Sequence, residues 1–166
     1  MARTLYLMRH AKSSWKEPLP DHERPLNKRG RRAAKAIGKA LARQGICPDL
    51  ILSSTALRAY DTAGRVAKRL DPPPQIISDD ELYEADESGI LSTLFVRGEE
   101  AEKVLLIGHN PTLSDLAVRL SKDERFQWLP TGAVVGLHWP NAKKWEEIVD
   151  QKGEITLELY PRALEE

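Results

Sequence analysis

Two histidines and two arginines stand where apolar runs of the chain end. Arg9-His10 directly follows one short run, His109 follows a second with only Gly108 between, and Arg58 comes soon after a third. Apolar runs that do not alternate are typical of strands buried on both faces of a sheet. Open α/β sheets bind ligands at the C-terminal ends of such strands. Two imidazoles and two guanidinium groups at that edge describe a site for a phosphoryl group, with one imidazole available as nucleophile.

His10 is the expected nucleophile. A neutral imidazole nitrogen can attack phosphorus and carry the phosphoryl group as a covalent intermediate. The other ring nitrogen should then donate to an acceptor such as a backbone carbonyl, so that the tautomer is fixed. An isolated histidine at a strand end is more often structural, but the adjacent Arg9 and the distant His109 favour catalysis.

Arg9 and Arg58 are predicted to hold the phosphoryl oxygens, because a guanidinium presents paired donors and stays charged. Arg58 also lies in the first turn of a predicted helix, where the backbone itself attracts anions. His109 is predicted to hydrogen-bond a phosphoryl oxygen, since it follows a strand and precedes a helix start.

Ser53 and Asn110 lie beside these residues, and two roles are open for each. Either side chain could cap a helix or contact the phosphate. Asn110 precedes Pro111, and a cap followed by proline at the first helical position is a favoured helix start. His22 and His138 have no partner motif and are expected to be structural.

The surrounding pattern predicts an α/β fold with a mainly parallel sheet. Strands are expected at 5–8, 46–52, 75–78 and 103–108, helices at 27–45, 56–70, 87–97 and after 110, and a polar loop at 12–24. The later segments 133–139, 145–149 and 154–160 look like strands joined by turns, which predicts antiparallel additions to the sheet. We expect a three-layer sandwich with helices on both faces, as one domain over residues 1–166.

The composition argues against several partners and locations. The 166 residues include 25 Lys+Arg and 25 Asp+Glu, so no net charge attracts nucleic acid or an anionic membrane. No apolar stretch approaches the length that spans a bilayer, and the first residues lead into a strand without a signal peptide. The one cysteine, Cys47, fits a reducing compartment. The expected location is the cytoplasm.

Other site chemistries fit the sequence less well. A glycine-rich phosphate loop with Lys-Ser/Thr is absent from it, as is the Gly-Xaa-Ser-Xaa-Gly motif of serine hydrolases. The 4 histidines are too scattered for a metal site, so no metal is expected. The acidic residues between 79 and 87 and the final Glu165-Glu166 are expected to be solvated surface.

Three motifs together resemble the histidine phosphatase superfamily, which has the phosphoglycerate mutase-like fold. These motifs are Arg-His-Ala at 9–11, the segment 53–63 that resembles the start of the second-arginine helix, and Gly-His-Asn-Pro at 108–111. At position 11 the family signature has glycine, and this chain has alanine. The resemblance implies that His10 is phosphorylated during turnover and that Arg9, Arg58 and His109 complete the pocket. It also implies that no metal or organic cofactor takes part.

Within the superfamily, the chain is most similar to the small SixA-type phosphohistidine phosphatases. The segments that carry this similarity are 9–15, 21–30 and 82–85. The resemblance implies that the substrate is a phosphohistidine of a partner protein. A chain of this length leaves little room for insertions around the pocket, so we expect a shallow, open site that admits a side chain of another protein.

The need for a general acid depends on the substrate. An alkoxide leaving group requires protonation, whereas an imidazole is far less basic and can leave without a well-placed carboxylic acid. Glu84, which follows the third predicted strand, is the best candidate for such an acid. Asp21, in the polar loop, is a weaker one.

Three functions are compatible with these residues. The first is a phosphatase of phosphohistidine in a partner protein, acting through phospho-His10 as part of signal transduction. The second is a phosphatase of small phosphate esters or sugar phosphates with the same nucleophile, for which Glu84 would matter. The third is a phosphate-binding module without catalysis, which the presence of every catalytic residue type disfavours.

Overall fold

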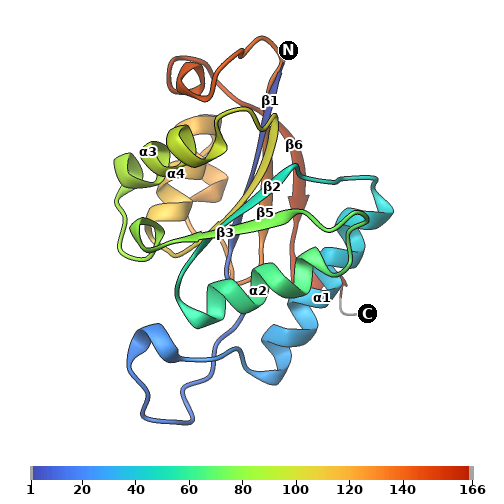
Figure 1. Ribbon diagram of the computed structural model, residues 1–166, viewed down its shortest axis with the longest axis vertical. Coiled ribbons are helices and arrows are strands. Elements are labelled where there is room, and N and C mark those ends of the chain that lie inside the picture. The colour runs from blue at the N-terminus through green and yellow to red at the C-terminus, as the bar shows by residue number, and fades with distance from the viewer. Residues whose placement is uncertain (1, 165–166) are drawn as a thin grey trace.

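A single six-stranded sheet lies at the centre of the computed structural model, which describes residues 2–164 (Figure 1). The strand order is β3-β2-β4-β1-β5-β6. Neighbours among the first four are parallel: β1 (Arg3–Arg9), β2 (Leu50–Ser54), β3 (Gln75–Asp79) and β4 (Lys103–Gly108). Antiparallel pairing joins β5 (Val134–Trp139) to β1 and β6 (Glu154–Leu159) to β5. The predicted mainly parallel sheet with antiparallel additions is confirmed.

Helices cover both faces of this sheet (Figure 1). They are α1 (Lys28–Arg43), α2 (Leu57–Ala67), α3 (Glu87–Gly98), α4 (Thr112–Ser121) and the short α5 (Pro161–Leu164). Side chains of β1 alternate between the faces: Tyr6 and Met8 pack with α1 and α2, while Leu5 and Leu7 pack with α3 and α4. The result is the three-layer sandwich that the sequence predicts.

The start of α1 is fixed by its cap and by a close approach to the loop after β1. The Asn27 side chain accepts a hydrogen bond from the Gly30 N–H and caps the helix. A side chain at position 30 would collide with the Lys12 backbone carbonyl, so only glycine allows α1 to pack this tightly. The helix therefore begins directly against the segment that follows His10.

The second strand is shorter than the sequence predicts. It begins at Leu50 rather than at residue 46. The Ile46 N–H donates to the Leu41 carbonyl of the preceding helix, and Pro48 has no N–H to offer a sheet. The apolar character of Ile46 therefore reflects packing against the core beneath α1 and α2.

The strand predicted for 145–149 is wrong, because Trp145–Asp150 forms a 3₁₀ helix. Trp145 and Ile148, three residues apart, both turn into the core, which is the spacing of a 3₁₀ turn. The Glu147 carboxylate accepts from the backbone N–H groups of Lys143 and Lys144 and fixes the start of this helix. Only β5 and β6 extend the sheet at this end.

Several acidic residues between 79 and 87 have structural partners. Asp86 caps α3 through the Gly89 N–H, and Asp79 pairs with Arg97. The final Glu165-Glu166 lies outside the described residues. Within residues 2–164, no helix combines the length and apolar character needed to cross a bilayer.

Candidate active site

The parallel pairing of β1 with β4 brings the two predicted histidines together. Arg9 lies opposite Gly108 in this pairing, so the residues that follow, His10 and His109, leave the sheet side by side. Their ring centroids are 5.1 Å apart, with the planes inclined by 53°. The site therefore forms at the C-terminal edge of the parallel strands, where open α/β sheets bind ligands.

His10 is held as a neutral imidazole with a defined tautomer. Its side chain is buried, at 6% exposure, and Nδ1 donates to the Ala11 carbonyl 2.7 Å away. Burial, together with the nearby cationic groups, lowers the pKa of His10 to about 3 despite that hydrogen bond. With Nδ1 protonated, Nε2 keeps its lone pair, as a nucleophile toward phosphorus requires.

Arg9 and Arg58 are both fixed by backbone contacts, and both keep a buried nitrogen unpaired. Arg9 Nη1 donates to the Leu129 carbonyl at 3.1 Å, and its guanidinium stacks on Trp128 at 5.3 Å from the ring centroid. Arg58 Nη1 donates to the Asp21 carbonyl at 2.7 Å. Nε of both arginines is buried without a hydrogen-bond partner among residues 2–164.

His109 also presents an unpaired nitrogen. Its Nε2 lies 2.8 Å from the Ser54 hydroxyl, whereas Nδ1 is buried without a partner in the described part of the chain. Burial and the charge of Arg58 lower the pKa of His109 to about 4, so the ring is neutral near pH 7. When Ser54 donates to Nε2, the proton of His109 lies on Nδ1 and can be donated to a phosphoryl oxygen.

The carboxylate of Asp21, which is the weaker of the two candidate acids in the sequence, orients Arg58. Asp21 Oδ2 accepts from Arg58 Nη2 at 3.0 Å and from the Tyr83 hydroxyl at 2.6 Å, and Oδ1 accepts from Arg24 Nε at 3.2 Å. The Tyr83 hydrogen bond, joined by those from the two arginines, lowers the pKa of Asp21 to about 2. Asp21 is thus a carboxylate at neutral pH, so it serves as a positioning residue rather than as a proton donor.

The side-chain polar groups of Ser53 and Asn110 form hydrogen bonds within the protein. The buried Ser53 hydroxyl donates to the Ser54 carbonyl. Asn110 Oδ1 accepts from both the backbone and the hydroxyl of Ser114, and Nδ2 donates to the Leu129 carbonyl at 2.9 Å. Asn110 thus bonds the first turn of α4, but the expected cap position is wrong by one residue, because α4 begins at Thr112 and Pro111 precedes it. The Leu129 carbonyl is also the one that holds Arg9.

Glu84 lies on the exposed stretch that precedes α3. It follows Tyr83, whose hydroxyl pKa is raised mainly by the hydrogen bond to Asp21, with a small addition from the charge of Glu84. A role for Glu84 as proton donor stays a prediction.

Two aromatic side chains that the sequence analysis did not assign to the site, those of His22 and Tyr83, lie beside His109. His22, expected to be structural and without a partner, hydrogen-bonds Thr55 and meets the Tyr83 ring edge-on, with centroids 4.7 Å apart. Tyr83 in turn lies edge-on to His109 at 5.6 Å. His138 bonds Thr4 within the sheet, away from this stack.

A threonine of α2 connects the segment after His10 to Arg58. The Thr62 hydroxyl accepts from the Ala11 N–H at 3.0 Å and donates to the Arg58 carbonyl at 2.7 Å. This fully buried hydroxyl joins the segment after β1 to the first turn of α2.

A sheet edge with a neutral buried histidine that feels the charges of two guanidinium groups is suited to phosphoryl transfer. The chain belongs to the histidine phosphatase superfamily (branch 1), whose model matches residues 5–90. The predicted superfamily and phosphatase class are thus confirmed.

The relatives and solved structures extend this likeness across the chain. An uncharacterised protein of Mycobacterium tuberculosis (strain ATCC 25618 / H37Rv) is 35% identical over 114 residues, covering 69% of this chain and 70% of that protein. A SixA structure from Nakamurella multipartitia, assigned as a phosphohistidine phosphatase, superposes with a TM-score of 0.84 at 28% identity, covering 97% of both chains. A SixA structure from Agrobacterium tumefaciens, with the same assignment, gives 0.80 at 30% identity, covering 96% of this chain and 99% of that one.

Proposed function

We propose that this protein removes the phosphoryl group from a phosphohistidine of a partner protein through a phospho-His10 intermediate. One observation carries the proposal: three buried nitrogens of the predicted site residues, namely Arg9 Nε, Arg58 Nε and His109 Nδ1, are unpaired within residues 2–164. An unpaired buried polar group costs about 1–3 kcal/mol. A phosphoryl group offers three oxygen acceptors and would satisfy all three donors.

In the first step, His10 Nε2 attacks phosphorus in line with the departing nitrogen of the partner. A phosphorus–nitrogen bond forms to His10 as the one to the partner imidazole breaks, and the partner ring, which has taken a proton from solvent on its other nitrogen before the bond breaks, leaves as a neutral imidazole. Arg9 and Arg58 hold the equatorial oxygens, where negative charge is spread in the transition state. In the second step, the oxygen of a water molecule displaces His10 from phosphorus and releases inorganic phosphate.

The carboxylate that touches Arg58 is ionised, which favours phosphohistidine as the substrate. Asp21, the carboxylate that touches Arg58, has a pKa of about 2 and holds no proton near neutral pH. An imidazole leaves without such an acid, whereas an alkoxide loses the ~10²–10⁴-fold contribution of general acid catalysis. The SixA neighbours, assigned as phosphohistidine phosphatases, point to the same substrate class.

Exposed aromatic side chains favour a protein over a small ester. Trp128, which stacks on Arg9, is 60% exposed, and Trp15, whose ring lies 3.4 Å from the Arg24 guanidinium, is 78% exposed. Arg24 contacts Asp21, which holds Arg58, so both tryptophans lie close to phosphate-binding arginines. Tryptophan and arginine are the residue types that most often dominate protein–protein binding energy.

The proposal is tested by comparing a phosphohistidine-containing protein with p-nitrophenyl phosphate as substrates. We expect a higher kcat/KM for the protein and a trapped radiolabelled phosphoryl group on His10. Higher rates on the small ester would favour the alternative, a phosphatase of small phosphate esters or sugar phosphates. Tight phosphate binding without a trapped intermediate would leave only a binding module.

A cytoplasmic signalling role is part of the proposal, supported by the free thiol of Cys47, and cell fractionation tests that location.

A further inference from the structure

Exposed apolar side chains are concentrated around the arginines of the phosphoryl site. Within residues 2–164, seven large apolar or aromatic side chains are exposed. Two of them, Val96 and Val149, lie in α3 and in the 3₁₀ helix Trp145–Asp150. The other five belong to the loop after β1, the first turn of α2 and the segment before β5, and they are Trp15, Leu19, Leu57, Tyr60 and Trp128. Single exposed apolar residues are ordinary, whereas a concentration of them marks an interaction site.

Leu57 and Tyr60 flank Arg58 in the first turn of α2. They are 44% and 47% exposed, while Arg58 is buried. Residues three positions apart lie on the same side of a helix, so Leu57 and Tyr60 share one face. The first turn of α2 therefore directs its arginine inward and presents these two side chains outward.

The loop after β1 carries Trp15 and Leu19, and it is attached to the start of α2. Leu19 lies two residues before Asp21, whose carbonyl and carboxylate both accept from Arg58. Trp15 stacks on Arg24, which donates to the same carboxylate. The 3₁₀ turn that begins at Asp21 also packs against α2. Both apolar loop residues are therefore connected to the ion pair that Arg58 forms.

The centre of this surface is cationic, whereas its surroundings are apolar. Arg9 and Arg58 each keep a buried Nε that has no hydrogen-bond partner in the described part of the chain. Trp128 stacks on the Arg9 guanidinium, so an aromatic ring lies beside this arginine as well. A complementary occupant therefore carries an anionic group with apolar groups next to it.

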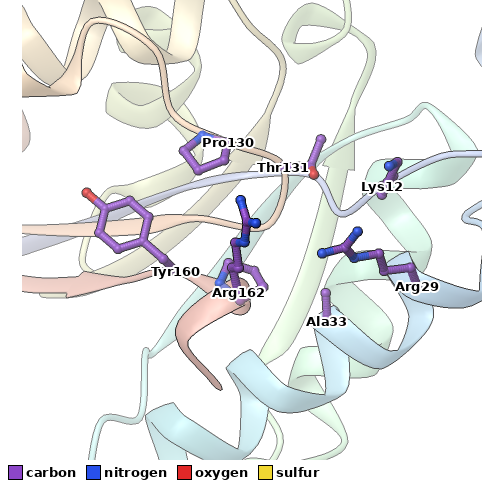
Figure 2. A pocket seen from close by; sticks show the side chains of 8 residues that line it. Lys12, Arg29, Ala33, Pro130, Thr131, Tyr160 and Arg162 are labelled. Atoms are coloured by element: carbon purple, nitrogen blue, oxygen red, sulfur yellow. The ribbon is translucent and has the colours of Figure 1, made fainter. Parts of the chain in front are cut away.

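The pocket between α1 and α5 has a different character. Its lining includes Lys12, Arg29, Thr131 and Arg162, and Figure 2 shows these side chains around the space between the two helices. None of the five exposed apolar side chains lines this pocket. Their concentration is therefore a property of the surroundings of the phosphoryl site and not of this neighbouring cavity.

We propose that Trp15, Leu19, Leu57, Tyr60 and Trp128 form a docking surface for a protein segment in which apolar residues flank the phosphohistidine. This inference rests on the proposed function and adds the chemistry of the partner that presents the phosphoryl group. Tryptophan, tyrosine and arginine dominate the binding energy of protein interfaces, and the neighbouring side chains contribute by excluding water. Exclusion of water also strengthens the contact between the arginines and the phosphoryl oxygens.

Two other occupants fit the cationic centre less well. A phosphodiester of a lipid headgroup has two free oxygens for three unpaired donors, which are Arg9 Nε, Arg58 Nε and His109 Nδ1. A second copy of this chain would have to present a phosphoryl group at its surface, but His10, the residue proposed to carry one, is buried. A phosphohistidine on a partner protein offers three free oxygens at the end of a side chain.

Two peptides that each contain one phosphohistidine test this surface. The residues that flank the phosphohistidine are leucine in one peptide and serine in the other. We expect the wild-type protein to hydrolyse the leucine peptide with about tenfold higher kcat/KM, because leucine gains free energy from burial and serine does not. Equal kcat/KM values for the two peptides would overturn the proposal.

The double substitution of Leu57→Ala and Tyr60→Ala should reduce this preference to about twofold. The matched control is Val96→Ala with Val149→Ala, which removes two exposed apolar side chains elsewhere and should keep the tenfold preference. Because the preference is a ratio of two substrates within one variant, a loss of folded enzyme cancels out. The same reduction in both double variants would mean that Leu57 and Tyr60 do not contact the partner.

Binding to the His10→Ala variant separates the docking surface from the proposed reaction. Trp15 and Trp128 are exposed whereas Trp139 and Trp145 are buried, so acrylamide quenching of tryptophan fluorescence reports mainly on the docking surface. We expect the leucine peptide to protect the tryptophans from quenching at about tenfold lower concentration than the serine peptide.

The possible outcomes distinguish the two proposals and the other occupants. If the leucine peptide binds preferentially but the wild-type protein hydrolyses neither peptide, the docking surface is supported and the proposed reaction is wrong. If the wild-type protein hydrolyses both peptides equally, the reaction is retained and the docking surface is wrong. Protection by phosphatidylglycerol vesicles or by a higher protein concentration, without protection by either peptide, would assign the surface to a lipid or to a second copy and overturn the proposal.

Discussion

Asp21 accepts two hydrogen bonds from Arg58: its backbone carbonyl lies 2.7 Å from Nη1 of Arg58, and its Oδ2 lies 3.0 Å from Nη2. This contact uses both terminal nitrogens of the guanidinium, and Nε stays buried and unpaired within residues 2–164. It also anchors the loop between β1 and α1 across the start of α2. The loop and the arginine therefore adopt their positions together.

Replacing Asp21 by Asn should weaken the hydrogen bond that orients Arg58, while the side chain keeps nearly the same volume. We expect kcat/KM to fall about tenfold, because a hydrogen bond to a charged group contributes roughly 1.5–3 kcal/mol. Asp61→Asn breaks a comparable contact with Arg65 on the outer surface of α2 and is the control. Steady-state kinetics on both variants checks this, and equal losses would mean that Asp21 has no special role.

His10→Ala should abolish turnover while the fold survives. Without the attacking nitrogen no phosphoenzyme forms, and we expect a loss of at least about a thousandfold. The measurement is transfer of radiolabelled phosphoryl to the protein, together with thermal unfolding to verify folding. Near-normal activity in this variant would rule out His10 as the nucleophile.

The free energy of unfolding should decrease as the pH is lowered, because the two site histidines are buried as neutral rings. Folding lowers their pKa from 6.5 to about 3 for His10 and about 4 for His109. Between pH 6.5 and the lowered value, each histidine is protonated only in the unfolded chain. The stabilisation is therefore complete above pH 6.5 and is lost as the pH falls to about 4 for His109 and to about 3 for His10. His109→Asn should reduce the loss of unfolding free energy between pH 7 and pH 5 by about 2 kcal/mol.

Urea unfolding at the two pH values provides this measurement. His138→Asn changes a histidine elsewhere in the sheet and serves as control. The same loss in wild type and in His109→Asn would contradict a buried neutral His109.

Trp15→Ala should affect a protein substrate more than a small one. Removing an aromatic anchor at an interface costs about 1–2 kcal/mol, so we expect KM for the phosphorylated partner to rise about tenfold. Val96, another exposed apolar residue, lies in α3, and Val96→Ala is the control. An equal effect of Trp15→Ala on p-nitrophenyl phosphate would count against a docking role.

Glu84→Gln separates the two proposed substrate classes. If the substrate is phosphohistidine, its turnover should change less than about twofold, because the leaving imidazole needs no acid. If small esters are the substrates and Glu84 protonates them, their kcat should fall by ~10²–10⁴-fold. Parallel assays on both substrates decide between the two.

The sequence predicted those parts of the site that local patterns encode. Buried strands are recognisable as apolar runs, and adjacent parallel strands must end at one edge, which is why His10 and His109 could be placed together. Asp21 and Tyr83 lie in two of the segments that resemble the SixA-type proteins, but they are 62 residues apart in the sequence, so the contacts of Asp21 with Tyr83 and Arg58 could not be predicted. The segment 145–149 was predicted as a strand because it is short and rich in apolar residues. Its apolar residues three positions apart are buried by a 3₁₀ helix, and so short a run does not distinguish the two structures.

The Thr62 hydroxyl sits between the exit of β1 and the first turn of α2, bonded to Ala11 on one side and to Arg58 on the other. One oxygen atom thereby links the segment that carries His10 to the helix that carries Arg58. Any displacement of α2 relative to the sheet would stretch the hydrogen bond to Ala11, while the bond to Arg58 lies inside the helix. The spacing between these two elements is thus built into the scaffold.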